Sequence, residues 1–184
     1  VDKASRILQA LGQAPDPQIA LKLLRICASF SKMVYSIRVV PSHHHADAIS
    51  NFDARVRECF EQFTSLHPSD EQWLQASLPA SLGGPGLLSF ARHSLAAFIA
   101  SRSSCFKFCQ DLDSAHTLAS SNGDLRTPET SAAYVLNDCV HDKDRVLQDP
   151  TDALSQKNLS AATDSRAFAE LSARVPLSHK AHLS

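Results

Sequence analysis

Side chains able to bind a metal ion are few and scattered in this sequence. The most prominent group is the run His43–His45, but three consecutive side chains on a helix point about 100° apart and cannot share one ion. A zinc site there would need Asp47, Cys59 or His67 as further ligands, and no Cys-x-x-Cys or His-x-x-x-His pair accompanies the run. We therefore predict a solvated turn at His43–His45 and no bound metal.

The motifs of nucleophilic catalysis, phosphate binding and metal-dependent hydrolysis are also missing. The sequence contains no G-x-S-x-G, H-E-x-x-H, G-x-G-x-x-G or P-loop pattern. The run Gly83–Gly86 could turn backbone N–H groups toward a phosphate, but Pro85 removes one donor and no Lys-Ser pair follows. We predict a tight helix-entry turn there, no catalytic residue and no cofactor. Carboxylates two residues apart diverge on a helix and are interpreted as solvated, namely the pairs Asp111/Asp113 and Asp142/Asp144.

The five cysteines are odd in number and scattered, in a chain long enough to fold without disulfides. Cys105 and Cys109 share one helix face, where parallel side chains have poor disulfide geometry. We predict buried, reduced thiols in an intracellular protein, cytoplasmic or nuclear. The set is Cys27, Cys59, Cys105, Cys109 and Cys139.

Apolar residues recur mainly at helical spacing, and only 5 Gly and 2 Tyr occur, which argues against a strand-rich fold. The pattern is clearest over 46–66, where the predicted buried side is Ile49, Phe52, Val56, Cys59, Phe60 and Phe63. Asp16 followed by Pro17 predicts a capped helix start, and Ser69 predicts another. A strand is the minority alternative over 33–40, where several residues are β-branched. The expected helices are 1–11, 17–28, 33–40, 46–66, 69–73, 89–110, 127–141, 151–157 and 161–173. The buried stripe of the second is predicted to be Ile19, Leu23, Leu24 and Cys27.

These elements predict an all-α fold, an irregular multi-helix bundle of about six to eight helices with a Gly/Pro-rich loop near 78–86. Hydrophobic residues make up 43% of the 184 and charged residues 20%, enough apolar side chains for a sizeable core. No secretory signal begins the chain and no run of about eighteen apolar residues occurs, so we predict no membrane association. The start, without Met and in mid-pattern, suggests a segment of a longer chain.

The net charge of −1 is the sum of two unlike parts. Residues 1–107 carry 11 basic and 8 acidic side chains, a difference of +3, whereas 108–184 carry 7 and 11, a difference of −4. Bulk charge therefore excludes a uniformly basic nucleic-acid-binding protein, although a local basic face remains open. We expect a helical domain over 1–110 and an acidic, helical C-terminal extension over 111–184, flexible in part.

Three stretches, taken in order, resemble one known arrangement. They are LKLLRICASFSKMVYSIRVVP at 21–41, FDARVRECF at 52–60, and QWLQASLPASLGGPGLLSFARHSLAAFIASR at 72–102. The order resembles the segment that follows the reverse-transcriptase palm in non-LTR (LINE-like) retrotransposon polyproteins, and it covers about residues 1–105. The matching residues are Leu23, Leu24, Arg25, Cys27, Tyr35, Arg38, Pro41, Phe52, Asp53, Trp73, Ala76, Leu78, Pro79, Gly83, Gly84, Gly86, Leu87, Ser89, Ala96, Ala97, Phe98, Ala100 and Ser101.

The resemblance implies a helical thumb and C-terminal extension, packed beside the palm of the same polyprotein. Such a thumb grips an RNA–DNA or RNA template–primer through its phosphate backbone, without sequence readout. The Asp cluster of the palm is absent from this chain, so the region alone should lack RNA-directed DNA polymerase activity. One departure is Leu88, where the family has a basic residue. The expected contact residues are Lys22, Arg25, Lys32, Arg38, Arg55, Arg57, Arg92 and Arg102.

Two other hypotheses stay open at the level of sequence. A helical protein-interaction or scaffold module, a decayed or domesticated remnant of such an element, predicts an exposed apolar patch where the palm once docked. A metal-dependent enzyme using His43–His45 is the least supported of the three, because the ligand spacing is missing.

Overall fold

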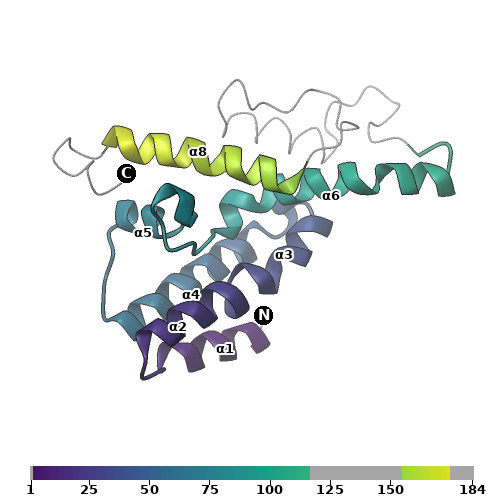
Figure 1. Ribbon diagram of the computed structural model, residues 1–184. Coiled ribbons are helices and arrows are strands. Elements are labelled where there is room, and N and C mark those ends of the chain that lie inside the picture. The colour runs from purple at the N-terminus through teal and green to yellow at the C-terminus, as the bar shows by residue number, and fades with distance from the viewer. Residues whose placement is uncertain (1, 117–154, 175–184) are drawn as a thin grey trace. The chain divides into compact units, whose positions relative to one another are not determined.

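The computed structural model describes residues 2–116 and 155–174, and every regular element in those ranges is a helix (Figure 1). The all-α prediction is confirmed, and 33–40 is helical rather than extended. The helix predicted at 127–141 lies outside the described residues, as does most of the one predicted at 151–157.

The chain divides into two compact units, and each unit draws on separated segments. Unit 1 comprises Val1–Val34, Ala46–Ala91 and Ala167–Ser184, and unit 2 comprises Tyr35–His45 and Arg92–Arg166. The domain boundary expected near residue 110 falls inside helix α6 (Phe90–Leu112), and one unit boundary falls near the start of that helix.

Unit 1 begins with α1 (Asp2–Gly12), which packs along α4 (Ala46–Thr64). Helix α2 (Pro17–Leu23) starts as predicted, because the Asp16 carboxylate accepts hydrogen bonds from the second and third N–H groups of the helix. A π-helical turn, η1 (Leu24–Ala28), continues it to Ser29, whose backbone angles (φ −95°, ψ −119°) lie outside the helical region and end the helix.

Aromatic side chains fill the centre of unit 1. Phe90, fully buried at the start of α6, stacks on Phe30 of α3 (Phe30–Val39) with ring centroids 5.0 Å apart. Phe52 of α4 meets the same ring edge-on at 5.1 Å. The buried side of α4 is the predicted one apart from half-buried Phe60, and consists of Ile49, Phe52, Val56, Cys59 and Phe63.

Helix α5 (Asp70–Ala76) and the following loop complete unit 1. Ser69 and Gln72 form a reciprocal capping box at the start of α5. The loop contains only one 3-10 turn, η3 (Ala80–Leu82), which agrees with the predicted absence of regular helix over 78–86. Leu78 packs there against Ala167 and Leu171 of α8 (Gln156–Arg174).

Unit 2 is built on the remainder of α6 and the first part of α8. Its apolar cluster consists of Ala96, Phe98, Ile99, Ala100, Leu159 and Ala162, with half-buried Leu95 packed against it. The small alanines let the two helices approach closely. A 3-10 turn, η2 (Ser42–His44), also belongs to unit 2.

The last turns of α6 do not bury the cysteines that the pattern assigned to the core. Cys105 is exposed and Cys109 is half-buried, while Phe108 and Leu112 are 71% and 90% exposed. The prediction of buried thiols is therefore wrong for Cys27 and Cys105 and right for Cys59, and Cys139 lies outside the described residues. The sequence pattern predicted which residues of α6 share a face, but it did not show that these residues are exposed in the last turns of the helix.

Candidate nucleic-acid interface

Four of the eight expected contact residues lie in a stretch of chain that has no acidic residue, and three of these four belong to unit 1. Between Asp16 and Asp47 the sequence contains neither Asp nor Glu. Lys22 of α2 and Arg25 of η1 are three residues apart, so their side chains leave the helix on one side, and Lys32 follows in the first turn of α3. All three residues are exposed. We call Lys22, Arg25 and Lys32 the basic set.

The loop between α5 and α6 supports one member of the basic set. Gly86 has a φ of +83°, which favours glycine, and a Cβ placed there would lie 3.1 Å from Nε of Arg25 and 3.4 Å from its Cζ. The absent side chain at Gly86 thus leaves the space in which the Arg25 guanidinium lies. The glycine-rich loop contributes to the candidate interface through shape rather than through its N–H groups.

Those N–H groups are already used inside the loop. The amides of Gly83, Gly84 and Gly86 donate to backbone carbonyls of residues 78–80, at 3.2, 3.2 and 2.9 Å. A Cβ on Gly84 would overlap the carbonyl oxygens of Gln75 and Leu78, so only glycine fits. The prediction of a tight turn is confirmed, and the amides do not form a phosphate cradle.

An exposed apolar stripe lies beside Lys22 and Arg25 on the same helix. Ile19, Leu23 and Ile26 are 57%, 42% and 58% exposed, so the predicted burial of Ile19 and Leu23, and of Cys27, is wrong. The face that packs inward carries Ala20, Leu24 and Ala28, all nearly inaccessible to solvent. The prediction gave the buried side to the larger apolar side chains. The structure instead buries the side with the two alanines, because their small size lets this helix approach its neighbours closely.

Arg57, in contrast, is committed to the fold of unit 1. Its guanidinium donates to Glu61 Oε1 at 3.1 Å, to Asp70 Oδ1 at 2.8 Å and to the Pro68 carbonyl, and lies 5.8 Å from the centre of the Trp73 ring. The hydrogen bond with Asp70 holds the pKa of Arg57 above its usual value, although partial burial acts in the opposite direction. This arginine joins α4 to the start of α5 and is a poor candidate for phosphate contact.

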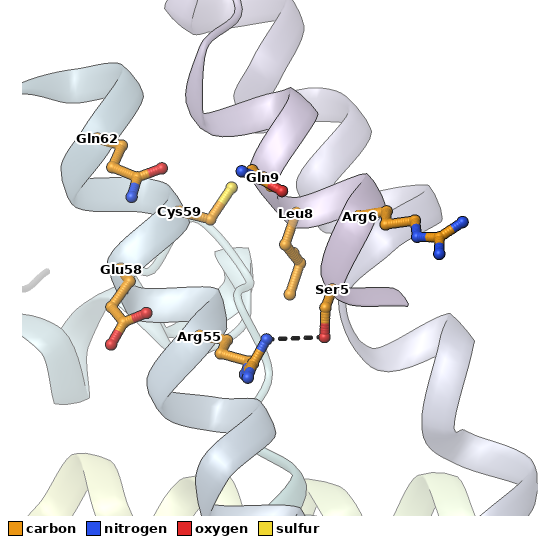
Figure 2. A pocket seen from close by; sticks show the side chains of 8 residues that line it. All are labelled: Ser5, Arg6, Leu8, Gln9, Arg55, Glu58, Cys59 and Gln62. Atoms are coloured by element: carbon orange, nitrogen blue, oxygen red, sulfur yellow. Dashed lines mark hydrogen bonds between the residues drawn. The ribbon is translucent and has the colours of Figure 1, made fainter. Parts of the chain in front are cut away.

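Arg55 lines a hollow of about 470 Å³ between α1 and α4. Figure 2 shows its guanidinium reaching the Ser5 hydroxyl, 2.8 Å away, while Arg6 extends away from α4. Cys59 lies deeper in the hollow, where burial raises the pKa of its thiol to about 11. The hollow does not gather its cations around one point, and it lacks the convergent groups of a specific small-molecule site.

The remaining expected contacts lie in unit 2. Arg38 is exposed on α3, whereas Arg92 and Arg102 are half-buried on α6. Arg92 Nη1 lies 3.8 Å from Oδ1 of Asp164, and His93 Nε2 lies 3.3 Å from the same oxygen. His93 is 1% exposed and Asp164 5%, so α8 is joined to α6 by a buried, charged contact. Arg92 therefore has a structural role here.

Sequence reasoning missed this buried contact. Asp164 is flanked by buried Ala162, Thr163 and Ala167 on the inward side of α8, and a carboxylate there is expected only if it is paired. A carboxylate among buried residues was thus the only sign in the sequence of an ion pair at Asp164. Its partners could not be inferred, because they lie about seventy residues earlier in the chain.

Asp53 also has a definite structural role that spacing did not predict. Its carboxylate accepts hydrogen bonds from the Ser89 hydroxyl at 2.7 Å and from the N–H groups of Phe90 and Ala91 at 2.9 and 3.1 Å. Asp53 of α4 thus caps the first turn of α6 from 37 positions earlier in the chain. Of the Phe-Asp pair noted in the resemblance, Phe52 is therefore an aromatic residue of the core and Asp53 caps a helix.

The predicted histidine turn is confirmed, as η2 contains His43 and His44 with both side chains exposed. Within residues 2–116 and 155–174, no three His, Cys, Asp or Glu side chains gather to hold a metal ion. None of the helices in the described part of the chain is long and apolar enough to cross a membrane. No protein-family model, curated protein or solved structure matches this chain.

Proposed function

We propose that this chain is a non-catalytic helical region of a retrotransposon RNA-directed DNA polymerase and that it helps to hold the template–primer duplex. The observation that supports this most strongly is the basic set, three exposed cations of unit 1 within a run of 30 consecutive residues that contains no carboxylate. Exposed Lys and Arg side chains suit contact with phosphates, which positions a duplex without reading its bases. The palm of the same polyprotein would supply the catalytic Asp cluster, which this sequence lacks.

The structure refines which cations this proposal uses. We propose that Lys22, Arg25 and Lys32 contact the phosphate backbone, whereas Arg57 and Arg92 are engaged in ion pairs within the fold. Arg38, Arg55 and Arg102 are predicted contacts for which the structure adds no further support. A grip by three cations is modest, so we expect weak binding that depends steeply on salt.

The test is a fluorescence anisotropy titration of a short RNA–DNA duplex with the 184-residue chain, between about 25 and 200 mM salt. Three phosphate contacts predict that log K falls with log salt at a slope of about −2.7. Lys22→Ala should reduce the slope by about 0.9, because one counterion-releasing contact is lost. Lys107→Ala, which removes an exposed lysine of α6, is the matched control and should leave the slope unchanged.

Two results would overturn the proposal. One is the absence of duplex binding at the lowest salt concentration, and the other is an equal change of slope for Lys22→Ala and Lys107→Ala. The family assignment has its own test, the reading frame upstream of Val1. A palm with its Asp pair there supports the assignment, and an unrelated sequence contradicts it.

A second candidate function is a protein-interaction module, and one specific observation favours it. The stripe Ile19, Leu23 and Ile26 is apolar, exposed and bordered by Lys22 and Arg25. Exposed apolar patches of this kind commonly mark contact surfaces. In the proposed parent protein the partner would be the palm.

One double variant distinguishes the two proposed functions. Leu23→Ser combined with Ile26→Ser should abolish association with a separately expressed palm while leaving duplex affinity unchanged. Loss of duplex affinity in this variant would instead place the stripe in the nucleic-acid interface. Binding to the palm that survives both substitutions contradicts the docking role of the stripe.

A further inference from the structure

Exposed rings and a cation follow one another closely in the chain, from the last turns of α3 to η2 in unit 2. Tyr35 is 77% exposed on α3, and Arg38 lies three residues later, so both leave the helix on one side. The rings of His43 and His44 are exposed in η2, with centroids 4.1 Å apart. We call Tyr35, Arg38, His43 and His44 the ring patch.

The turn that carries the two histidines is held in a defined shape. The His45 ring Nδ1 lies 3.0 Å from the Pro41 carbonyl oxygen, and the N–H of His44 donates to the same carbonyl at 3.1 Å. Pro41 fixes the backbone where α3 ends. Rings presented by a fixed turn lose little conformational freedom when a ligand stacks on them.

We propose that the ring patch binds single-stranded nucleic acid, with bases stacked on Tyr35 and the histidine rings and a phosphate on Arg38. This inference goes beyond the duplex grip and does not depend on it. The ring patch lies in the other unit and shares only Arg38 with the expected duplex contacts.

The chemistry favours an unpaired strand over a duplex. Bases in a duplex are stacked on one another, so flat side chains reach their faces only where a strand is unpaired. The acid-free stretch extends through the whole patch, so no carboxylate in residues 17–46 repels a phosphate there. Stacking on a tyrosine tolerates any base and needs no hydrogen-bond readout, and the patch offers none.

The test compares a fluorescent oligonucleotide of about twelve uridines with an abasic strand of equal length, because the second keeps every phosphate but has no base. The full chain should bind the uridine strand about tenfold more tightly than the abasic one. Tyr35→Ala should reduce that preference severalfold, because only the histidine rings would remain for stacking, and should leave the abasic affinity unchanged. Tyr35→Phe, which retains the ring, should preserve it, and a thymidine strand should behave like the uridine strand.

Phe108→Ala is the matched control, since Phe108 is an equally exposed aromatic ring of unit 2, but has Asp111 one helical turn away. It should not alter the preference for bases. Equal binding of the uridine and abasic strands by the native chain overturns the proposal. An undiminished preference in Tyr35→Ala, with circular dichroism showing an intact fold, overturns it as well.

Discussion

The basic set and Arg57 show two different uses of the same charge in one unit. Lys22, Arg25 and Lys32 lie where the chain has no acidic residue and their charges face water. Arg57 lies in α4, one helical turn before Glu61 and across from Asp70, and both carboxylates bind it. Sequence alone ranked these four cations equally.

The difference teaches that an exposed cation suggests a ligand only where the fold supplies no carboxylate. An ion pair on the surface contributes little stability by itself. Arg57, however, also donates to a backbone carbonyl and lies beside Trp73, which makes it a junction between helices. The two regions should therefore respond to mutation through different measurements, affinity for the basic set and folding stability for the paired cations.

The largest effect is expected from reversing the basic set. The variant Lys22→Glu/Arg25→Glu/Lys32→Glu should lose all measurable duplex binding at low salt, because three attractive contacts become repulsive. Its unfolding free energy should change by less than about 0.5 kcal/mol, as surface substitutions usually do. Anisotropy and urea unfolding measure the two quantities.

The matched control reverses three other exposed cations, Lys107, Lys157 and Arg174, and changes the net charge by the same amount. If both triple variants lose binding equally, bulk charge rather than the basic set is responsible.

The next effect is expected from Asp164, the acidic partner on the paired side of the comparison. Asp164→Ala should lower the unfolding free energy by about 3 kcal/mol, because Arg92 and His93 would then face a buried site without its carboxylate. Duplex affinity at 25 °C should not change while the chain stays folded. Denaturant unfolding followed by circular dichroism measures this loss, and a loss below about 1 kcal/mol contradicts the structural role.

A smaller effect is expected from Arg57. Arg57→Ala should lower the unfolding free energy by about 1 to 2 kcal/mol, through loss of charge-assisted hydrogen bonds. Asp70→Asn should have a much smaller effect, because the Asp70 side chain is 95% exposed. Duplex affinity should be the same for both variants and the native chain. A fall in affinity without a fall in stability would move Arg57 from the fold to the interface.

The smallest effect is expected from Cys59, on the buried side of α4, and it concerns the pH dependence of folding stability. The exposed cations of the basic set should not contribute to it. Burial raises the pKa of Cys59 from 9.0 to about 11, so the folded chain retains this proton where the unfolded chain releases it. The contribution of this thiol to the free energy of unfolding is fully present below pH 9 and is lost as pH rises toward 11. The loss is about 1 kcal/mol at pH 10. Cys59→Ala should remove that slope, as unfolding at pH 8 and pH 10 would show. Identical slopes in both proteins contradict the assignment.

Much of the helical framework could be predicted from local signals. Asp16 with Pro17 marked the start of α2, Ser69 marked α5, and the apolar spacing of 46–66 gave the buried side of α4. Each of these signals acts within a few residues, so it is readable without knowing the fold.

The rest depended on distant contacts. The inward face of α2 and η1 was mispredicted because Ala20 and Ala28 count as weakly apolar, although small size is what close packing selects. The sequence named the candidate cations but could not separate exposed from paired ones, since Asp70, which binds Arg57, lies 13 positions away and Asp164, beside Arg92, lies 72 positions away. Tyr35 is one of the residues that carry the resemblance, but that pattern did not predict that its ring is exposed.

The cap on α6 has a consequence for the order of events in folding. Helix α6 begins with N–H groups bound by Asp53, which belongs to an earlier helix. A peptide of α6 alone would fray at its first turn, and so would a nascent chain in which α4 has not yet formed. One carboxylate thereby makes the beginning of a helix conditional on a long-range encounter, and formation of the two helices becomes a single cooperative step.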